Sequence, residues 1–143
     1  MIVTVLPGHI ADIARIEKAR FSTPWSEEGL SFELTADYAR FLADVEDGQV
    51  RAYGIFHVFG DEAELVNIAA DEEYEGCGLG RALLARLIDD AAREGVRSVF
   101  LEVRRSNLRA QGLYRSLGFE NIGLRPGYYN EPKEDALLMA LSI

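Results

Sequence analysis

The sequence has little of the chemistry on which metal sites and disulfides depend. It contains one cysteine, Cys77, and two histidines, His9 and His57. A single cysteine cannot close a disulfide within the chain, and the three residues do not have the spacing of a zinc-ligand set. We therefore expect any catalysis by this protein to proceed without a metal.

Long apolar runs and an excess of basic residues are also missing. No stretch approaches the roughly twenty apolar residues of a membrane-spanning helix, and residues 1–5 lack the basic segment that opens a secretion signal. The net charge of -9 disfavours direct binding to nucleic acid and is compatible with a basic peptide. We expect a soluble, cytoplasmic protein with neither a nucleic-acid nor a membrane partner. No pattern in the sequence indicates an oligomeric state.

The composition is that of one globular domain. The chain has 143 residues, 48% of them hydrophobic, which is enough to bury a substantial core. Strand and helix patterns follow one another in the order β-α-α-β-β-β-α-β-α-β-β, without repeats. The predicted strands are residues 2–6, 39–46, 49–59, 63–70, 97–103, 119–124 and 136–142. We expect an α/β fold with one mixed sheet between helices, a single three-layer domain over residues 1–143.

Local signals place the predicted helices between these strands. Pro7 opens the first helix, and Ser26 is a suitable cap for the second. The third follows a glycine-rich loop and runs to about Glu94, and the fourth extends from its cap Asn107 to Leu117. Gly112 lies inside this last helix, where glycine costs about 1 kcal/mol relative to alanine. Close approach of a cofactor or a strand is one explanation for it.

The glycine-rich loop is the most informative segment of the chain. It reads Glu75-Gly76-Cys77-Gly78-Leu79-Gly80 and runs directly into the helical pattern of residues 81–88. Three glycines allow a sharp turn and close approach to a ligand, while the first amides of the helix have no partners within it. The junction therefore predicts an anion site formed by Gly76, Cys77, Gly78, Leu79, Gly80 and Arg81.

The sequence around this loop disfavours two common phosphate motifs. A Walker loop needs Lys and then Ser or Thr after its last glycine, where this chain has Arg81 and Ala82. The dinucleotide fingerprint spaces its glycines as G-x-G-x-x-G after a first strand, whereas several predicted strands precede this loop. On the glycines alone, an ordinary surface loop before a helix is an equally good interpretation.

Several motifs in the right order resemble the GCN5-related N-acetyltransferase (GNAT) superfamily over nearly the whole chain. They are Asn67-Ile68-Ala69-Ala70, the run from Tyr74 through the glycines to Leu84, and Asn107 with Leu113-Tyr114-Arg115-Ser116-Leu117-Gly118-Phe119. Within that superfamily, four further segments resemble the bacterial RimI-type ribosomal-protein-alanine N-acetyltransferases. These segments are residues 21–26, 101–104, 128–129 and 135–141.

The resemblance implies acetyl-CoA as cosubstrate. The loop and helix amides would hold its pyrophosphate, with Asn107 as a further cofactor contact. The backbone of Ile68, Ala69 and Ala70 would pair with the pantetheine arm like an added strand. One position departs from the family, which usually has Gln or Arg where this chain has Glu75. A carboxylate is unfavourable beside a pyrophosphate, and Arg81 is a candidate source of compensating charge.

Two residues suit the chemistry of acetyl transfer to an amine, which needs a base and a proton for the departing thiolate. Glu102 follows an apolar strand segment, where partial burial would raise its pKa. An α-amine has a pKa of about 7.7 to 8.0, so it is easily deprotonated near neutral pH. The base could remove this proton directly or through a water molecule. Tyr114, seven residues after Asn107 on one helix face, suits the acid role. The alternatives are a solvated strand glutamate and a packed core tyrosine.

Aromatic residues near predicted loops are candidates for an acceptor channel. Trp25 lies on a proline-containing loop, and Tyr128 and Tyr129 follow Pro126-Gly127; ordinary rim aromatics are the alternative. Cys77 is expected to be a loop residue and not a nucleophile, because direct transfer needs no acyl-enzyme.

The resemblance thus implies acetylation of a protein N-terminal amine, with alanine of a small-subunit ribosomal protein as the expected acceptor. One alternative is a GNAT enzyme that acetylates a lysine side chain or a small-molecule amine. Lysine, with a pKa of about 10.4, would demand more of the base. Another is a non-catalytic acetyl-CoA sensor, which retention of both Glu102 and Tyr114 disfavours.

Overall fold

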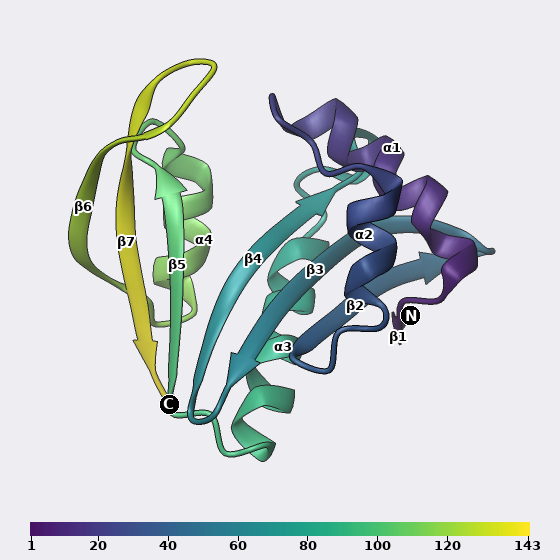
Figure 1. Ribbon diagram of the computed structural model, residues 1–143, viewed down its shortest axis with the longest axis horizontal. Helices are drawn as coiled ribbons and strands as arrows, with labels where there is room; N and C mark the ends of the chain where they lie inside the picture. Colours follow the sequence, from purple (N-terminus) through teal and green to yellow (C-terminus); the bar gives the residue numbers. More distant parts are fainter.

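A computed structural model describes all 143 residues and contains a seven-stranded mixed sheet with helices on both faces (Figure 1). The strands are β1 (Ile2–Thr4), β2 (Ala39–Glu46), β3 (Gln49–Phe59), β4 (Glu62–Ala70), β5 (Ser98–Arg104), β6 (Glu120–Tyr129) and β7 (Glu134–Ser142). The helices are α1 (Ile10–Arg20), α2 (Glu27–Glu33), α3 (Leu79–Arg93) and α4 (Leu108–Ser116), with 3-10 turns at Pro7–His9 and Glu72–Tyr74. The predicted α/β class and element order are confirmed.

Local sequence signals fix most of these boundaries. Asp47 and Gly48, with φ of 51° and 77°, form the tight turn between β2 and β3. The side chain of Ser26 accepts a 3.1 Å hydrogen bond from the amide of Gly29 at the start of α2, and Asn107 accepts one of 3.1 Å from Ala110 at the start of α4. Both caps satisfy amides that the first helical turn leaves without partners.

The two faces of the sheet carry separate cores. On one face, α3 and α4 bury Leu84, Leu87 and Tyr114 against Val99 and Leu101 of β5 and their neighbours. On the other face, residues of α1, α2, β2 and β3 form a smaller core: Ile10, Ile13, Ile16, Leu30, Phe41, Tyr53 and Ile55. None of the helices is both long and apolar enough to span a bilayer.

Several predicted boundaries toward the two ends of the chain differ from the structure. The first strand ends at Thr4 instead of residue 6, and a 3-10 turn precedes α1. The sixth strand continues past residue 124 to Tyr129, because its partner β7 begins earlier than predicted and Tyr129 pairs with Glu134. Tyr128 and Tyr129 therefore lie at the end of a strand and not in a loop.

The feature of the fold that positions the site is the divergence of β4 from β5. These parallel strands pair over only three positions, where Glu62, Ala63 and Glu64 lie opposite residues 98–100. Beyond Glu64 the strands separate, as Figure 1 shows. A register shift in the β3–β4 pairing, which leaves Val66 as an extra residue, coincides with the start of this separation. One edge of β4 therefore has no strand partner over residues 65–70.

Candidate active site

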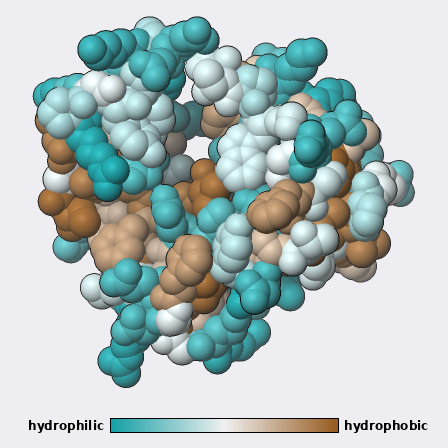
Figure 2. Space-filling view, viewed as in Figure 1, coloured by the Kyte–Doolittle hydropathy of each residue, from teal (hydrophilic) through white to brown (hydrophobic).

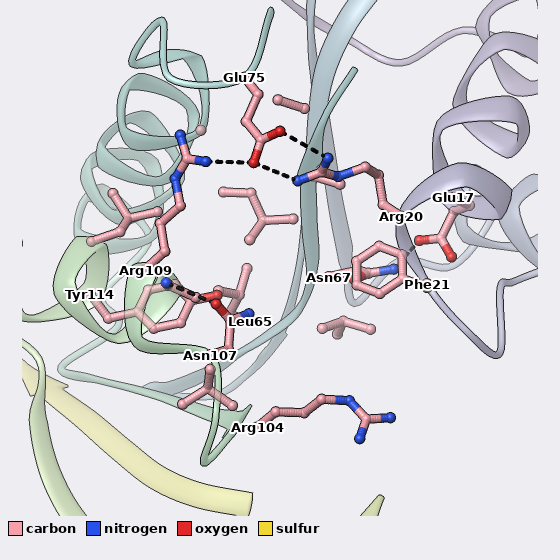
Figure 3. Close-up of a pocket in the computed structure, with 18 of the residues that line it drawn as sticks. Glu17, Arg20, Phe21, Leu65, Asn67, Glu75, Arg104, Asn107, Arg109 and Tyr114 are labelled. Carbon is pink, nitrogen blue, oxygen red and sulfur yellow. Dashed lines mark hydrogen bonds and ion pairs between the residues drawn. The ribbon is translucent and has the colours of Figure 1, made fainter. Parts of the chain in front are cut away.

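A cavity of about 670 Å³ lies between the diverging ends of β4 and β5. The last residues of β4, including Ile68, Ala69 and Ala70, line it together with Asn107 at the start of α4. Figure 2 shows the surface hollowed between the two parts of the sheet, and Figure 3 gives a close-up of the cavity. The structure thus brings the predicted strand, loop and helix residues to one place.

The glycine-rich loop presents a row of free amides to this cavity. Gly76 and Gly78 have φ of 80° and 81°, a conformation that favours glycine. The amides of five cavity-lining residues donate to no group in the chain: Gly76, Gly78, Leu79, Gly80 and Arg81. With the dipole of α3 behind them, these amides have the features of an anion site, and the five residues are named the anion cradle. Cys77, which the sequence grouped with them, is exposed and does not line the cavity.

Glu75 lies at the mouth of the cavity between two arginines (Figure 3). Nη1 and Nη2 of Arg20 each donate to its carboxylate at 3.2 Å, and Nη1 of Arg109 donates to Oε1 at 2.5 Å. Arg20, and more weakly Arg109, hold the pKa of Glu75 below its usual value. Arg81, the predicted source of compensating charge, lines the same cavity and donates a 3.4 Å hydrogen bond to Ser116.

Glu102 is the one residue that lines both this cavity and a second one of about 460 Å³. Strand alternation points Leu101 and Val103 into the core under α3 and α4, so Glu102 faces the opposite side of the sheet. Burial raises the pKa of Glu102, the nearby charge of Glu64 raises it further, and Arg125 lowers it. The expected direction of the pKa shift is thus found, for the expected reason.

Tyr114 lines the first cavity from α4, and its hydroxyl makes no hydrogen bond within the chain. The residue is 6% exposed and its ring packs against Phe119. Burial, with a further contribution from Tyr129, raises the pKa of Tyr114 above its ordinary value. The hydroxyl therefore stays protonated at neutral pH and has a proton to donate.

The three predicted aromatic residues are divided between the two cavities. Trp25 and Tyr129 line the first cavity, while Tyr128 lines the second together with Glu102. The guanidinium of Arg104 lies 4.4 Å from the centre of the Tyr129 ring, and burial raises the pKa of Tyr129 to about 12. The two tyrosines lie edge to face, with ring centres 5.0 Å apart.

Sequence reasoning missed a buried carboxylate in the wall of the first cavity. Glu17 of α1 is fully buried and accepts hydrogen bonds from the hydroxyl of Tyr53 and the side-chain amide of Asn67. It also accepts a 3.0 Å hydrogen bond from the backbone amide of Trp25. Burial raises the pKa of Glu17, although the Tyr53 and Trp25 hydrogen bonds oppose this effect. Its position on the apolar face of α1 was the available signal.

Comparison with known proteins places the chain in a family. The sequence pattern of the Acetyltransferase (GNAT) family matches residues 10–119. The [ribosomal protein bS18]-alanine N-acetyltransferase of Escherichia coli is 43% identical over 130 residues, which are 90% of this chain and 87% of that protein. The protein of the same name from Haemophilus ducreyi is 36% identical over 144 residues, which cover 99% of each chain.

A solved structure agrees with these relatives. The crystal structure of the ribosomal-protein-S18-alanine N-acetyltransferase from Escherichia coli matches with a TM-score of 0.92 and 38% sequence identity. The match covers 100% of this chain and 93% of that one. The family pattern, the relatives and the fold agree with the site geometry, and the chain therefore belongs to the GNAT family of acetyltransferases.

Proposed function

We propose that the protein transfers an acetyl group from acetyl-CoA to the N-terminal α-amine of a protein. The observation that carries this proposal is the arrangement of one cavity, which has free amides at one end and Glu102 and Tyr114 in its walls. Such a cavity fits a long thioester with an anionic end and a reactive end. We infer that the whole chain, residues 1–143, acts as one catalytic domain in the cytoplasm.

The residues present fit the coenzyme along its length. The five free amides before and within the first turn of α3 suit a pyrophosphate, since backbone donors and the helix dipole favour negative charge. The unpaired edge of β4 at Ile68, Ala69 and Ala70 offers donors and acceptors to the amide groups of a pantetheine arm. Asn107 caps α4 at the cavity wall and completes this side. The coenzyme supplies an activated acetyl group.

Glu102 is the proposed base and Tyr114 the proposed acid. Because Glu102 lines both cavities, it can accept a proton from an amine that enters from the second cavity. Its raised pKa brings it closer to that of an α-amine, about 7.7 to 8.0. The free hydroxyl of Tyr114 donates a proton to the departing thiolate sulfur, so that proton uptake and release balance. Direct transfer leaves no acyl group on the enzyme.

We propose alanine at the N-terminus of a small-subunit ribosomal protein as the acceptor. The names of the relatives at 43% and 36% identity support this choice, since both are bS18-alanine N-acetyltransferases. Trp25 and Tyr129 in the first cavity, and Tyr128 in the second, supply aromatic walls for an extended peptide. The position of Trp25 is fixed through the hydrogen bond from its amide to Glu17.

Mass spectrometry of two peptides tests the proposal. One peptide carries a free N-terminal alanine, and the other is blocked at its N-terminus and contains an internal lysine; both are incubated with acetyl-CoA. We expect acetylation of the free α-amine alone, after which bS18 itself is the next substrate to test. Acetylation of the lysine would favour a lysine acetyltransferase. No acetylation, with binding of CoA intact, would favour a small-molecule acceptor or a sensor.

A further inference from the structure

An ion triad lies in the wall of the first cavity. Arg20 comes from the end of α1, Glu75 from the loop before α3, and Arg109 from the first turn of α4. Figure 3 shows the two guanidinium groups pointing toward each other with the carboxylate between them. The contacts are 3.2 Å to Arg20 and 2.5 Å to Arg109. Two cations share one anion, so the triad has a net positive charge.

The triad adjoins the anion cradle directly. A Cβ atom added to Gly76, the first glycine of the cradle, would lie 3.3 Å from Nη2 of Arg109. All three triad residues line the same cavity as the free amides. The side chain of Arg109 is 65% exposed and that of Glu75 is 34% exposed, so both have room to change partners. A phosphate group at this mouth would meet two guanidinium groups already held in place.

We propose that Arg20 and Arg109 form a phosphate-binding site, and that Glu75 occupies this site in the ligand-free protein. When the coenzyme binds, one of its phosphate groups replaces the carboxylate as the anion between the two arginines. This inference rests on the proposed function, because it takes acetyl-CoA as the ligand. It assigns a role to Glu75, whose charge is otherwise unfavourable beside a pyrophosphate.

The chemistry of the groups supports such an exchange. Arginine presents a planar fork of donors that matches carboxylate and phosphate oxygens equally well. A phosphate carries at least as much negative charge as a carboxylate and has more acceptor oxygens. Glu75 therefore holds Arg20 and Arg109 in a converging geometry before the ligand arrives, which lowers the ordering required on binding. It also competes with the ligand, because its carboxylate must give up these contacts.

Calorimetric titration with CoA tests the exchange without reference to turnover. For Glu75→Gln, which removes the competing charge, we expect CoA binding about 3-fold to 10-fold tighter than in the wild type. For Arg109→Gln, we expect CoA binding to weaken by about 5-fold to 10-fold. This loss is at the low end of the range for a charge-assisted hydrogen bond, because the Arg109 side chain is exposed. The matched controls are Glu72→Gln and Arg93→Gln, exposed residues that do not line the cavity. Neither control should change CoA affinity beyond about 2-fold.

The double variant separates exchange from a simple contribution of charge. In the wild type, Arg109 loses its contact with Glu75 when it contacts the phosphate, so its net contribution to binding is reduced. In the Glu75→Gln background this loss is absent, and Arg109→Gln should weaken binding by a larger factor than in the wild type. The exchange would be contradicted if Arg109→Gln weakened CoA binding by the same factor in both backgrounds. It would also be contradicted if Glu75→Gln alone bound CoA more weakly than the wild type.

Ligand fragments identify the phosphate group. Pantetheine, which lacks phosphates, should bind all of these variants alike. If dephospho-CoA, which lacks the 3′-phosphate, shows the same pattern as CoA, the site receives the diphosphate; if the pattern disappears, it receives the 3′-phosphate. CoA binding that is normal in the wild type and unchanged in both single variants would refute this site alone. Absence of CoA binding by the wild type would refute the proposed cosubstrate as well.

Discussion

A guanidinium nitrogen of Arg125 on β6 lies 4.0 Å from the carboxylate of Glu102 on β5, across the intervening strand β7. Arg125 lowers the pKa of Glu102, whereas the carboxylate of Glu64 on β4 raises it. All three residues line the second cavity. Burial is the main cause of the raised pKa of Glu102, and these two neighbours of opposite sign modify it; each of them can be neutralised separately.

Neutralising these neighbours should move the acidic limb of the pH–rate profile in opposite directions. A base acts when ionised, so activity falls as the pH drops through the pKa of Glu102. Arg125→Gln removes the cation that lowers this pKa, and the limb should move to higher pH. Glu64→Gln removes the anion that raises it, and the limb should move to lower pH. The measurement is kcat/KM against pH for the free amine substrate. Shifts in the same direction would contradict the assignment of this limb to Glu102.

Replacing the base itself should affect turnover and not cofactor affinity. We expect Glu102→Gln to lower kcat by about 10²-fold to 10⁴-fold, the usual contribution of general base catalysis. CoA affinity, measured by calorimetry, should stay within about 2-fold of the wild type, because the anion cradle lies at a different part of the cavity. A variant that keeps full turnover would rule out Glu102 as the base.

Tyr114→Phe should separate acid catalysis from packing. The hydroxyl makes no hydrogen bond in the chain, so its removal should change the free energy of unfolding by about 0.5 kcal/mol or less. Turnover should fall by about 10²-fold if the hydroxyl protonates the thiolate. Urea denaturation and steady-state kinetics measure the two effects. A large loss of stability with unchanged kcat would show that the residue serves packing alone.

Gly112→Ala should stabilise the protein. Gly112 lies inside α4, and a Cβ atom there would meet nothing within 4 Å. Neither a strand nor any other part of the chain requires a glycine at this position. The substitution should add about 1 kcal/mol to the free energy of unfolding, or about 3 °C to Tm, without loss of activity. An unchanged or lower Tm would show that α4 tolerates this methyl group poorly.

Glu17 should act as a positioning residue for the loop that carries Trp25, a proposed wall of the peptide site. Glu17→Ala leaves the Trp25 amide and the Asn67 side chain without their acceptor, and we expect a loss of about 3 kcal/mol in unfolding free energy. Because Trp25 loses its anchor, the KM for the peptide should rise more than kcat falls. Unchanged kinetics in a folded variant would contradict this role.

The pH dependence of stability gives a second test of Glu17. Its pKa is raised in the folded protein, so its contribution to stability is present below the pKa of the unfolded chain, about 4.3. This contribution is lost as the pH rises through the raised value. Glu17→Gln keeps the shape of the side chain and removes its charge. The unfolding free energy of the wild type minus that of this variant should therefore fall as the pH rises from the unfolded pKa through the raised folded pKa. Denaturation at a series of pH values measures this difference.

Local patterns made the fold and part of the site predictable. The β2–β3 hairpin was predicted with its correct bounds, because Asp47-Gly48 is a turn signal contained in two residues. The end of β6 was not predicted, since it depends on pairing with β7. The glycine-rich loop and Glu102 were selected from contiguous residues, and the structure places both in the wall of one cavity.

The remaining site residues depend on contacts between distant segments. Glu75 is 55 residues from Arg20 and 34 from Arg109, so no local spacing indicates that they meet. The same is true of Glu17 and Asn67, which are 50 residues apart. Packing of α1, α3 and α4 around the diverging strands creates these contacts. In sequence alone, Glu75 was visible only as a departure from the family pattern.

The short ladder between β4 and β5 also gives a bound ligand a structural role in the sheet. Three paired positions join the two halves of the sheet, and the edge of β4 over residues 65–70 has no partner from β5. A molecule that binds along this edge supplies the missing partner and bridges the two halves of the sheet, which also share a buried core under α3 and α4. At a concentration one hundred times its Kd, such a molecule adds about 2.7 kcal/mol to the stability of the folded chain. If acetyl-CoA is this molecule, amide hydrogen exchange along β4 would report how fully the protein is loaded, and removal of the coenzyme would lower the stability of the folded chain.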